Sequence, residues 1–352
     1  MSESIYYNKY LSYKKKYLEL QKAGNPNDII TKLDDDSQSQ VLKYLSQQEA
    51  VKLSETSVSN SKVTDNYKEC NMDIVNINLQ TWRQKFPNTT CINISYRTDL
   101  TDDDFQYLRG IKKINMTGCY QITNNAFQYL TDVEDLDISN CQYLTEHIFI
   151  DLINLKKLTL FDLLNITDDI FPYFSNLEEL ILDSCDQITN NAFAHLKKLK
   201  KLDFSSCIEI TDDAFHNLTN LEELTIELCE DFTDNAFINL INLKKLNIKR
   251  CDKVRNDNYY DIINNSLITD NLFRNLPKLE ELSINNCVGI TENAFTNLTN
   301  LKKLHIENIY FNQINLNNLT NLEDLTIIGD RVEYIHIQNL KKIRNIIIQK
   351  SR

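Results

Sequence analysis

The segment LEELTIELCEDFTDNAFINLIN, residues 221–242, decides the fold because much of the chain repeats it. Its first half, LxxLxIxxC, alternates apolar and polar side chains, which is typical of a short β-strand. Its second half places apolar residues from Phe232 to Leu240 at the spacing of one helical face. Thr233 stands where a helix N-cap is expected, and the charge of Asp234 suits the N-terminus of a helix. The segment therefore predicts a strand, a turn, a short helix and a second turn.

The same pattern recurs at a constant period, the step from Cys185 to Cys207. Cysteine marks one column, at Cys119, Cys141, Cys185, Cys207, Cys229 and Cys251, with Leu163 at the one missing position. Phenylalanine marks a second column from Phe105 to Phe237, and leucine a third from Leu136 to Leu246. One unit buries too few side chains to fold alone, so neighbouring units must share a core. The fold class we expect is α/β: a curved solenoid with parallel strands on its concave side and short helices on its convex side.

The turn that leads into each strand also has a column. Asparagine occupies it at Asn154, Asn176, Asn220, Asn242 and Asn300. Asparagine tolerates the left-handed backbone conformation better than most residues. We therefore expect a positive φ angle at these positions.

The repeats extend over residues 79–348, about eleven in all, with irregular ends and one interruption. Trp82 aligns with the helical half of a repeat, and we expect it to seal the N-terminal end. The separation of Cys251 and Cys287 is more than one and a half periods. We therefore expect an insertion near 254–267.

The C-terminal end departs from the period in another way. Leu325, Ile335 and Ile346 predict strands only half a period apart, which indicates a shortened repeat. The last strand is flanked by Lys341, Lys342, Arg344, Lys350 and Arg352. Charge on a terminal strand discourages pairing with other chains.

A charge pattern precedes the central leucine of every strand. Basic and acidic pairs alternate without exception over ten units, from Lys112-Lys113 and Glu134-Asp135 to Lys302-Lys303 and Glu323-Asp324. Two interpretations are open. The strip could recognise a charged partner, or adjacent strands could neutralise one another, which would also fix their register. Self-neutralisation is the simpler interpretation, and it makes the strip a poor surface for a partner of one charge.

The repeats resemble the leucine-rich-repeat family, and more closely its cysteine-containing subtype. The resemblance rests on the LxxLxIxxC strand followed by I-T-D/N-x-A-F, as in Cys119–Phe127 and Cys207–Phe215. The period is shorter than is usual for that subtype, which implies short helices.

Binding is expected beside the charge strip, where side chains alternate with buried strand residues and project from the concave face. The partner is expected to be a protein, with Tyr96 and Phe161 as the best anchors because aromatic side chains dominate interface energy. The candidate residues are Tyr96, Phe161, Ile181, Asp183, Asp203, Thr225, Glu227, Asn247, Lys249, Arg250, Asn285 and His305.

The segment VLKYLSQQEAVKLSETS, residues 41–57, has the spacing of two short amphipathic helices. It resembles the F-box, a small all-α module, in its I-L-x-Y-L-x-x-x-D-L-x-x-L-x-x-x-S part. Asn25–Ile30 resembles the opening of that module, although Asp34–Gln40 separates the two pieces. The resemblance covers 25–60, followed by a polar connector at 61–78. The alternative is a plain helical cap on the solenoid.

If the module is an F-box, the resemblance implies a non-catalytic substrate adaptor for a cullin–RING ubiquitin ligase, with a target held on the repeats. A Skp-family adaptor would then bind through Pro26, Ile29, Ile30, Val41, Leu42, Leu45 and Val51. The other reading is a stand-alone binding scaffold without a link to ubiquitin ligases.

Residues 1–24 form a basic segment rich in Tyr and Lys that predicts an N-terminal helix. The segment resembles a stretch that recurs in proteins of giant DNA viruses, which implies a viral protein in the host cytoplasm. A helix that packs loosely and a helix that contacts an acidic partner or a membrane surface are both open.

The chain lacks the features of other function classes. Its net charge of −12 disfavours nucleic-acid binding, which needs a basic surface. No apolar run is long enough for a membrane span, and the start MSESIYYNKY does not have the layout of a signal peptide. The sequence has no HExxH, GxSxG or phosphate-loop motif, so we expect no enzyme, no cofactor and no metal. Nine cysteines in a chain of this kind predict reduced, buried thiols and a cytoplasmic protein.

Overall fold

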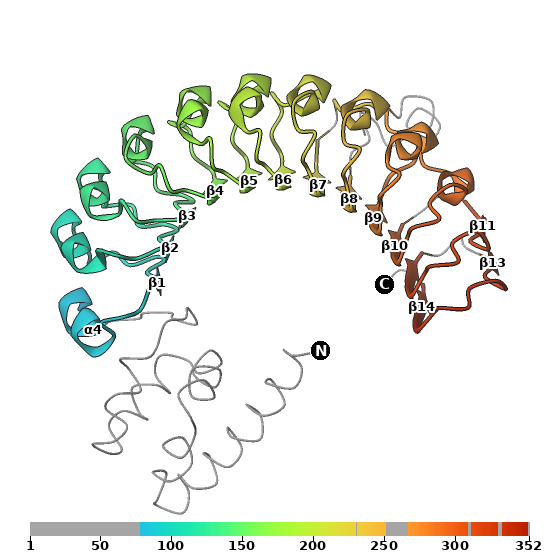
Figure 1. Cartoon of the computed structure of the whole chain (residues 1–352), viewed down its shortest axis with the longest axis horizontal. Coiled ribbons are helices and arrows are strands. Elements are labelled where there is room, and N and C mark those ends of the chain that lie inside the picture. The colour runs from blue at the N-terminus through green and yellow to red at the C-terminus, as the bar shows by residue number, and fades with distance from the viewer. Residues whose placement is uncertain (1–77, 230, 251–266, 309–310, 330–332, 351–352) are drawn as a thin grey trace, which may run out of the picture. The chain divides into compact units, whose positions relative to one another are not determined.

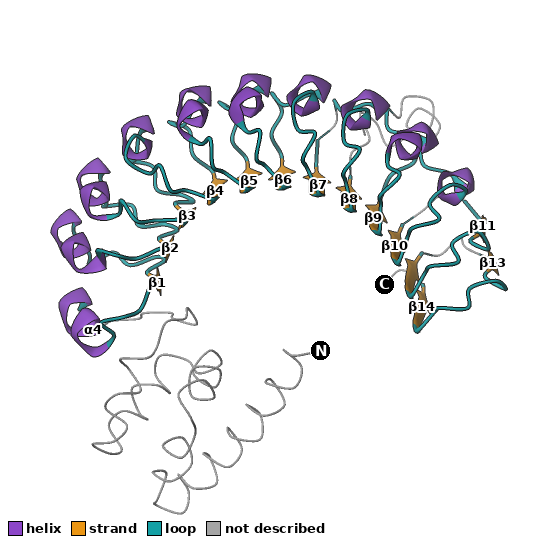
Figure 2. Cartoon of the chain, in the orientation of Figure 1, coloured by secondary structure: helices purple, strands orange, loops and turns teal. Residues whose placement is uncertain are grey.

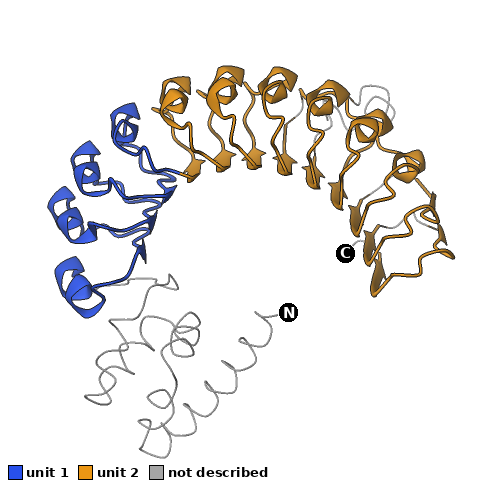
Figure 3. Cartoon of the chain, in the orientation of Figure 1, with its two compact units in different colours: residues 1–155 blue, residues 156–352 orange. Residues whose placement is uncertain are grey.

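The computed structural model describes residues 78–229, 231–250, 267–308, 311–329 and 333–350 (Figure 1). The chain divides into two compact units, Met1–Leu155 and Lys156–Arg352, and each is described by itself (Figure 3). The predicted segment 1–24, the F-box-like residues Pro26 to Val51 and most of the predicted insertion lie outside the described residues.

Within its described residues, unit 1 contains one α-helix and three repeats of a strand followed by a short 3₁₀-helix. The elements are α4 (Leu79–Lys85), β1 (Cys91–Asn93), η3 (Asp102–Leu108), β2 (Lys113–Asn115), η4 (Asn124–Tyr129), β3 (Asp135–Asp137) and η5 (Glu146–Phe149). The strands are parallel, and Cys91 aligns with Lys113 and Lys113 with Asp135, so the register follows the period. Trp82 of α4 is fully buried, which is consistent with the expected role of this residue in sealing the N-terminal repeats.

Unit 2 continues the same pattern with longer strands. Its strands are β4 (Lys157–Phe161), β5 (Glu179–Asp183), β6 (Lys201–Ser205), β7 (Glu223–Glu227), β8 (Lys245–Lys249), β9 (Glu281–Asn285), β10 (Lys303–Glu307), β11 (Gln313–Asn315), β12 (Asp324–Ile328), β13 (Tyr334–His336) and β14 (Asn345–Gln349). Its short helices are η6 (Asp168–Tyr173), η7 (Asn190–His195), η8 (Asp212–Phe215), η9 (Asp234–Phe237), η10 (Asp270–Asn275) and η11 (Glu292–Phe295).

Strands and short helices form two layers in unit 2, with the strands on the inner side of the curve (Figure 2). The expected solenoid with parallel strands is therefore confirmed. The outer elements are 3₁₀-helices because the short period leaves only four to six residues for each. β8 pairs with β9 in register, Lys245 opposite Glu281, although the chain between these residues is longer than one period.

The core lies between the two layers. Along each strand from β5 to β7, the second and fourth residues are buried and the others half-buried. The phenylalanines of the short helices fill the space behind the strands, and Phe193, Phe215 and Phe237 are each at most 1% exposed. Apolar area is removed from water only where repeats stack, so the stacking itself stabilises the fold.

The cysteine column is part of this core. Cys119, Cys141, Cys185, Cys207, Cys229 and Cys287 are buried free thiols, and Leu163 at the missing position is 2% exposed. Burial raises the pKa of Cys207 to about 11 and that of Cys229 to about 12. The expected packing role is confirmed at these positions. Cys91 lies outside this column, at the start of β1, and is disulfide-bonded, so the prediction of reduced thiols is wrong for this residue.

The asparagine column does not have the backbone conformation that we expected. Positive φ angles occur instead just after the strands, at Asn140, Asp162, Ser184, Ser206, Leu228, Arg250, Asn286 and Asn308, with Tyr96 and Gly118 at the same position in unit 1. The asparagines act through their side chains: Asn220 donates to the carbonyl of Lys197 at 2.9 Å, and Asn242 to that of Thr219 at 2.8 Å. They join each turn to the turn of the preceding repeat, so the prediction of a left-handed turn there was wrong.

The prediction of a shortened repeat at the C-terminal end was also wrong. Leu325 and Ile346 align directly in the main sheet, in β12 and β14, and are close to one full period apart. Ile335 lies in β13, which pairs with β11 in a separate two-stranded sheet. β11 and β13 take the place of the short helices on the outer side (Figure 1). Two sets of strands, one for each layer, produce the half-period spacing.

A second set of contacts between repeats was not expected. The aspartate that opens one short helix accepts two hydrogen bonds from the N-cap threonine of the next. Thr233 donates to Asp212 through its amide at 2.8 Å and through its hydroxyl at 2.5 Å, and Thr189 does the same to Asp168. This pairing, called the Thr–Asp ladder below, gives the I-T-D motif a role in stacking as well as in capping.

Within the described residues, no helix has the length and the apolar composition needed to cross a membrane.

Candidate protein-binding face

The sheet of unit 2 presents three rows of side chains on its inner face. The strand registers place the first, third and fifth residues of each strand opposite one another. The first row is the charge strip, called the Lys–Glu ladder below. The second row runs from Thr159 through Ile181 and Asp203 to His305, and the third from Phe161 through Asp183 to Glu307.

The Lys–Glu ladder is paired between strands, as self-neutralisation predicted. Glu179 lies 2.8 Å from Lys157 and 2.9 Å from Lys201, and Lys303 lies 2.9 Å from Glu281. The residues just before the strands pair as well, with Lys244 at 2.7 Å from Glu222. Partial burial raises the pKa of Glu179, but hydrogen bonds from its two lysines more than offset this and the pKa is lowered. The ladder therefore carries little net charge to attract a partner.

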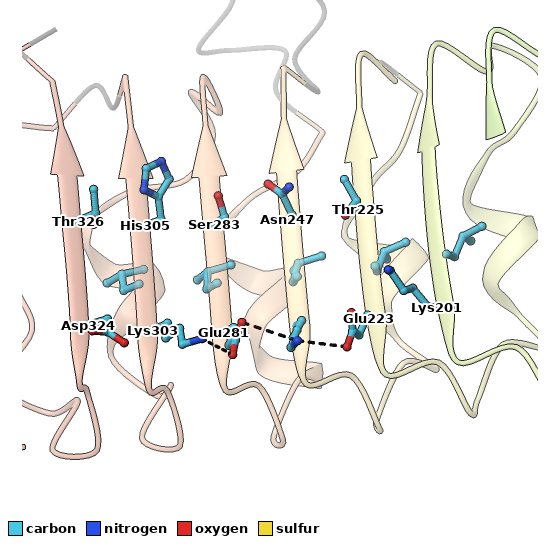
Figure 4. A pocket seen from close by; sticks show the side chains of 16 residues that line it. Lys201, Glu223, Thr225, Asn247, Glu281, Ser283, Lys303, His305, Asp324 and Thr326 are labelled. Atoms are coloured by element: carbon cyan, nitrogen blue, oxygen red, sulfur yellow. Dashed lines mark ion pairs between the residues drawn. The ribbon is translucent and has the colours of Figure 1, made fainter. Parts of the chain in front are cut away.

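A shallow groove of about 350 Å³ crosses β6 to β12 on this face (Figure 4). One wall is the Lys–Glu ladder, and the other is formed by Thr225, Asn247, Ser283, His305 and Thr326. Asn247 and Asn285 each keep a buried side-chain oxygen that accepts no hydrogen bond within the described residues.

The second and third rows over β4 to β6 differ from the Lys–Glu ladder because their two carboxylates, those of Asp183 and Asp203, have no basic partner within the described residues. Phe161 is opposite Asp183, and Ile181 is opposite Asp203, so two apolar side chains alternate with two carboxylates on neighbouring strands. In the part of the chain that the structure describes, the carboxylate of Asp183 accepts only from the Ser184 hydroxyl, and that of Asp203 has no hydrogen bond or ion pair. We call these four residues the acidic–apolar patch.

The environment of Asp203 makes its charge costly. Burial raises the pKa of Asp203 because it disfavours the charged carboxylate. Lys201 and Lys249 partly oppose this effect, whereas the charges of Glu227 and Asp183 add to it. Lys201 is engaged with Glu179, and Lys249 lies 3.4 Å from Glu227. A cation brought by a partner would relieve this unfavourable charge.

The other predicted residues of unit 2 lie on the same face or at its edge. Thr225, Glu227, Asn247, Lys249, Asn285 and His305 are half-buried in the second and third rows. Arg250 is exposed and adopts a positive φ of 50°, one residue past β8. Sequence reasoning missed Leu228, which has a positive φ of 54° and is 44% exposed at the same position after β7.

Tyr96 belongs to unit 1 and follows the short strand β1. Its φ is 59° and it is 66% exposed. Its ring lies directly over Gly118, where an added Cβ would approach the ring Cδ1 to 2.6 Å. Glycine is therefore required at position 118 for this placement. The ring is held in position while its outer face stays open to solvent.

The described residues contain no group of three or more His, Cys, Asp or Glu side chains that could hold a metal ion.

Comparison with known families identifies the repeats. The sequence profile of the BspA-type leucine-rich-repeat region matches in six copies over residues 83–178, 154–265 and 251–351. The chain therefore belongs to the BspA-type leucine-rich-repeat proteins. The expectation of leucine-rich repeats is confirmed by this match. Among curated proteins, none matches the chain.

Solved structures share the fold at low sequence identity. A TLR13 chain in complex with ssRNA13 superimposes with a TM-score of 0.55 at 19% identity, over 82% of this chain and 44% of that one. The glycosylated Toll–Spatzle complex of Drosophila gives 0.54 at 16% identity, over 75% and 37%. An internalin of Listeria monocytogenes gives 0.50 at 17% identity, over 89% and 93%. This chain spans less than half of the TLR13 and Toll chains, and these likenesses show the fold alone.

Proposed function

We propose that the protein is a non-catalytic interaction protein that binds a protein partner on the inner strand face of unit 2. The observation that carries the proposal is the acidic–apolar patch. The Lys–Glu ladder beside it is neutralised by its own pairs, whereas Asp183 and Asp203 have no basic partner in the described part of the chain and lie next to Phe161 and Ile181.

The chemistry of the patch favours a partner segment with a basic residue. An arginine or lysine side chain can lay its apolar stem on Phe161 and Ile181 and bring its charge to the two carboxylates. Phe161 is 39% exposed, so its ring is open to such a contact. A guanidinium over an aromatic face is worth about 0.5–2 kcal/mol and adds to the ion pairs.

Affinity capture tests this function. Wild-type protein is used as bait, and bound proteins are identified by mass spectrometry beside three variants. Phe161→Ala and the double variant Asp183→Asn/Asp203→Asn should each lose at least nine-tenths of the specific partner. Asp213→Asn, a change of the same kind at a solvent-exposed position of η8, should retain it. Retention by all three variants would place the partner elsewhere.

The adaptor role is the more specific proposal, and it rests on the F-box-like sequence of residues 25–60. We propose that this module binds a Skp-family adaptor, so that a target on the strand face is brought to a ubiquitin ligase. Purified adaptor should bind the wild type and not Leu45→Asp, whereas Lys43→Asp, with a new charge two residues away, should bind. Failure of the wild type to bind would leave the stand-alone scaffold as the function. The proposed location is the cytoplasm, that of the host cell if the viral resemblance reflects origin.

A further inference from the structure

The last strand of the sheet, β14, has an open edge. Within the described residues it pairs with β12 on one side and with no strand on the other. On the paired side, the amides of Arg344 and Asn345 donate to the carbonyl of Glu323 at 2.7 and 3.1 Å. The opposite backbone groups of a parallel strand point the other way and are available to a further strand.

The side chains of β14 are in core register but are not covered. Ile346 aligns with Leu325 and Ile348 with Ile327. Leu325 and Ile327 are each 1% exposed, whereas Ile346 is 43% and Ile348 51% exposed. The two strands differ in that β12 has a neighbouring strand on both sides. The exposed isoleucines are thus the open end of the core.

The charges around β14 do not protect its edge. Proteins blunt an edge strand with charges or proline inside the strand. Here all five residues from Asn345 to Gln349 are uncharged, and the basic residues Arg344 and Lys350 lie just outside them. Together with Lys341 and Lys342, they form a basic border around an apolar strand in a chain whose net charge is −12. Our sequence-based interpretation of these charges as an edge guard does not fit this arrangement.

We propose that β14 is a second docking site, which binds an acidic, extended segment of a partner protein as an added parallel strand. The alternation of charge in the Lys–Glu ladder determines how the added strand would align with β14. Arg344 lies 3.2 Å from Glu323 on its paired side and is 73% exposed, so an acidic residue on an added strand would continue the alternation. Apolar residues two and four positions after that acid would cover Ile346 and Ile348.

A second copy of this chain fits the edge poorly. Two copies of β14 related by a twofold axis would run antiparallel and centre on Ile347. This arrangement would place Arg344 of each copy near Lys350 of the other, and like charges directly opposite on neighbouring strands are destabilising. The site therefore selects a partner whose charge is opposite to its own.

Two peptides with the sequences of this chain's own strands provide a matched test. LEELSINN (residues 279–286) carries the acidic pair, and LKKLHIEN (residues 301–308) carries the basic pair at the same positions. Each is added, with blocked ends, to the full chain while the methyl NMR signals of Ile346, Ile347 and Ile348 are followed. The acidic peptide should bind at least tenfold more tightly than the basic one. Arg344→Glu should reverse this preference.

A second variant keeps the test decisive. Ile348→Lys should abolish the shifts from both peptides while the isoleucine signals of β5 and β7 stay unchanged, which shows that the fold persists. Equal binding of the two peptides, shifts that survive Ile348→Lys, or no shift at millimolar peptide would overturn the proposal. Concentration-dependent dimerisation through β14 would do so too. The strand-face variants of Phe161 and Asp203 should bind the peptides normally, so this result is separate from that of the proposed function.

Discussion

Two ladders join the repeats of unit 2, one on each side of the core, and they differ in what they contribute. On the outer side, the Thr–Asp ladder links a partly buried backbone amide to a carboxylate, as Thr233 does to Asp212. On the inner side, the Lys–Glu ladder links side chains that remain substantially exposed, as Lys244 and Glu222 do. An unsatisfied buried amide costs far more than a lost surface ion pair. The first ladder thus stabilises the stack, whereas the second mainly sets register and removes net charge.

The largest expected effect tests the outer ladder. Asp212→Ala removes both acceptors of Thr233 and should lower the free energy of unfolding by about 1–3 kcal/mol. Urea denaturation followed by circular dichroism measures the loss. Asp212→Asn should lose less, because Asn190 accepts from the amide of Thr211 at 2.8 Å in the same position. Asp213 is exposed and serves as the control. If Asp213→Ala lowered the free energy of unfolding as much as Asp212→Ala, the loss could not be attributed to the Thr–Asp ladder.

The core between the ladders gives the next effect. Cys207→Ala should cost about 1 kcal/mol, because it removes a buried group about as large as a methylene. Denaturation measures this cost too, and binding of the captured partner should not change. Stoichiometric zinc in the purified protein, or modification of Cys207 by a thiol reagent in the native state near neutral pH, would contradict a packing role for a thiol with a pKa of about 11.

The inner ladder should give a smaller effect. Glu179→Gln loses two ion pairs and should cost about 0.2–1 kcal/mol, an effect that shrinks in high salt. The lowered pKa of Glu179 gives the pH dependence: its contribution is present above the pKa of the unfolded chain and is lost as the pH falls through the folded pKa. Denaturation at several pH values and salt concentrations checks both. A salt-independent cost as large as that of Asp212→Ala would show that this ladder is as important as the outer one.

The acidic–apolar patch should give the smallest effect on stability, with the opposite sign. The raised pKa of Asp203 means that the folded protein binds its proton more tightly, so this site loses stability as the pH rises from the unfolded to the folded pKa. At neutral pH, Asp203→Asn should therefore stabilise the free protein slightly while it weakens partner binding. Thermal unfolding of this variant tests the gain in stability, and capture of the partner by the same variant tests the loss of binding. A destabilised variant would indicate a structural role for this carboxylate.

The sequence predicts the columns of the repeat well, because each column corresponds to one environment. Cysteine, leucine and phenylalanine at a fixed period give the core, and the alternating pairs give the Lys–Glu ladder. Hydrogen bonds between repeats could not be read in the same way. In the sequence, Asp212 is explained by the N-terminus of its own helix and Asn242 by its own turn. Only the stacked structure shows that each also forms a hydrogen bond with a neighbouring repeat.

The sequence predicts the residues of the binding face but not their pairing. Periodicity places Phe161, Ile181, Asp183 and Asp203 on one face, but it does not show which carboxylates are paired. That depends on the register of Phe161 with Asp183 and of Ile181 with Asp203. The C-terminal strands mislead for another physical reason. Strand patterns look alike in both layers, so Ile335 cannot be assigned to the outer sheet from its sequence.

The most direct test of the central claim is zero-length cross-linking between the protein's carboxylates and the lysines of the captured partner. Cross-linked peptides are then located by mass spectrometry. The strand-face account predicts cross-links at Asp183 and Asp203 and none at Asp213, which is more exposed but lies in η8 on the outer side. Cross-links confined to Asp213 and its neighbours on the short helices would contradict it.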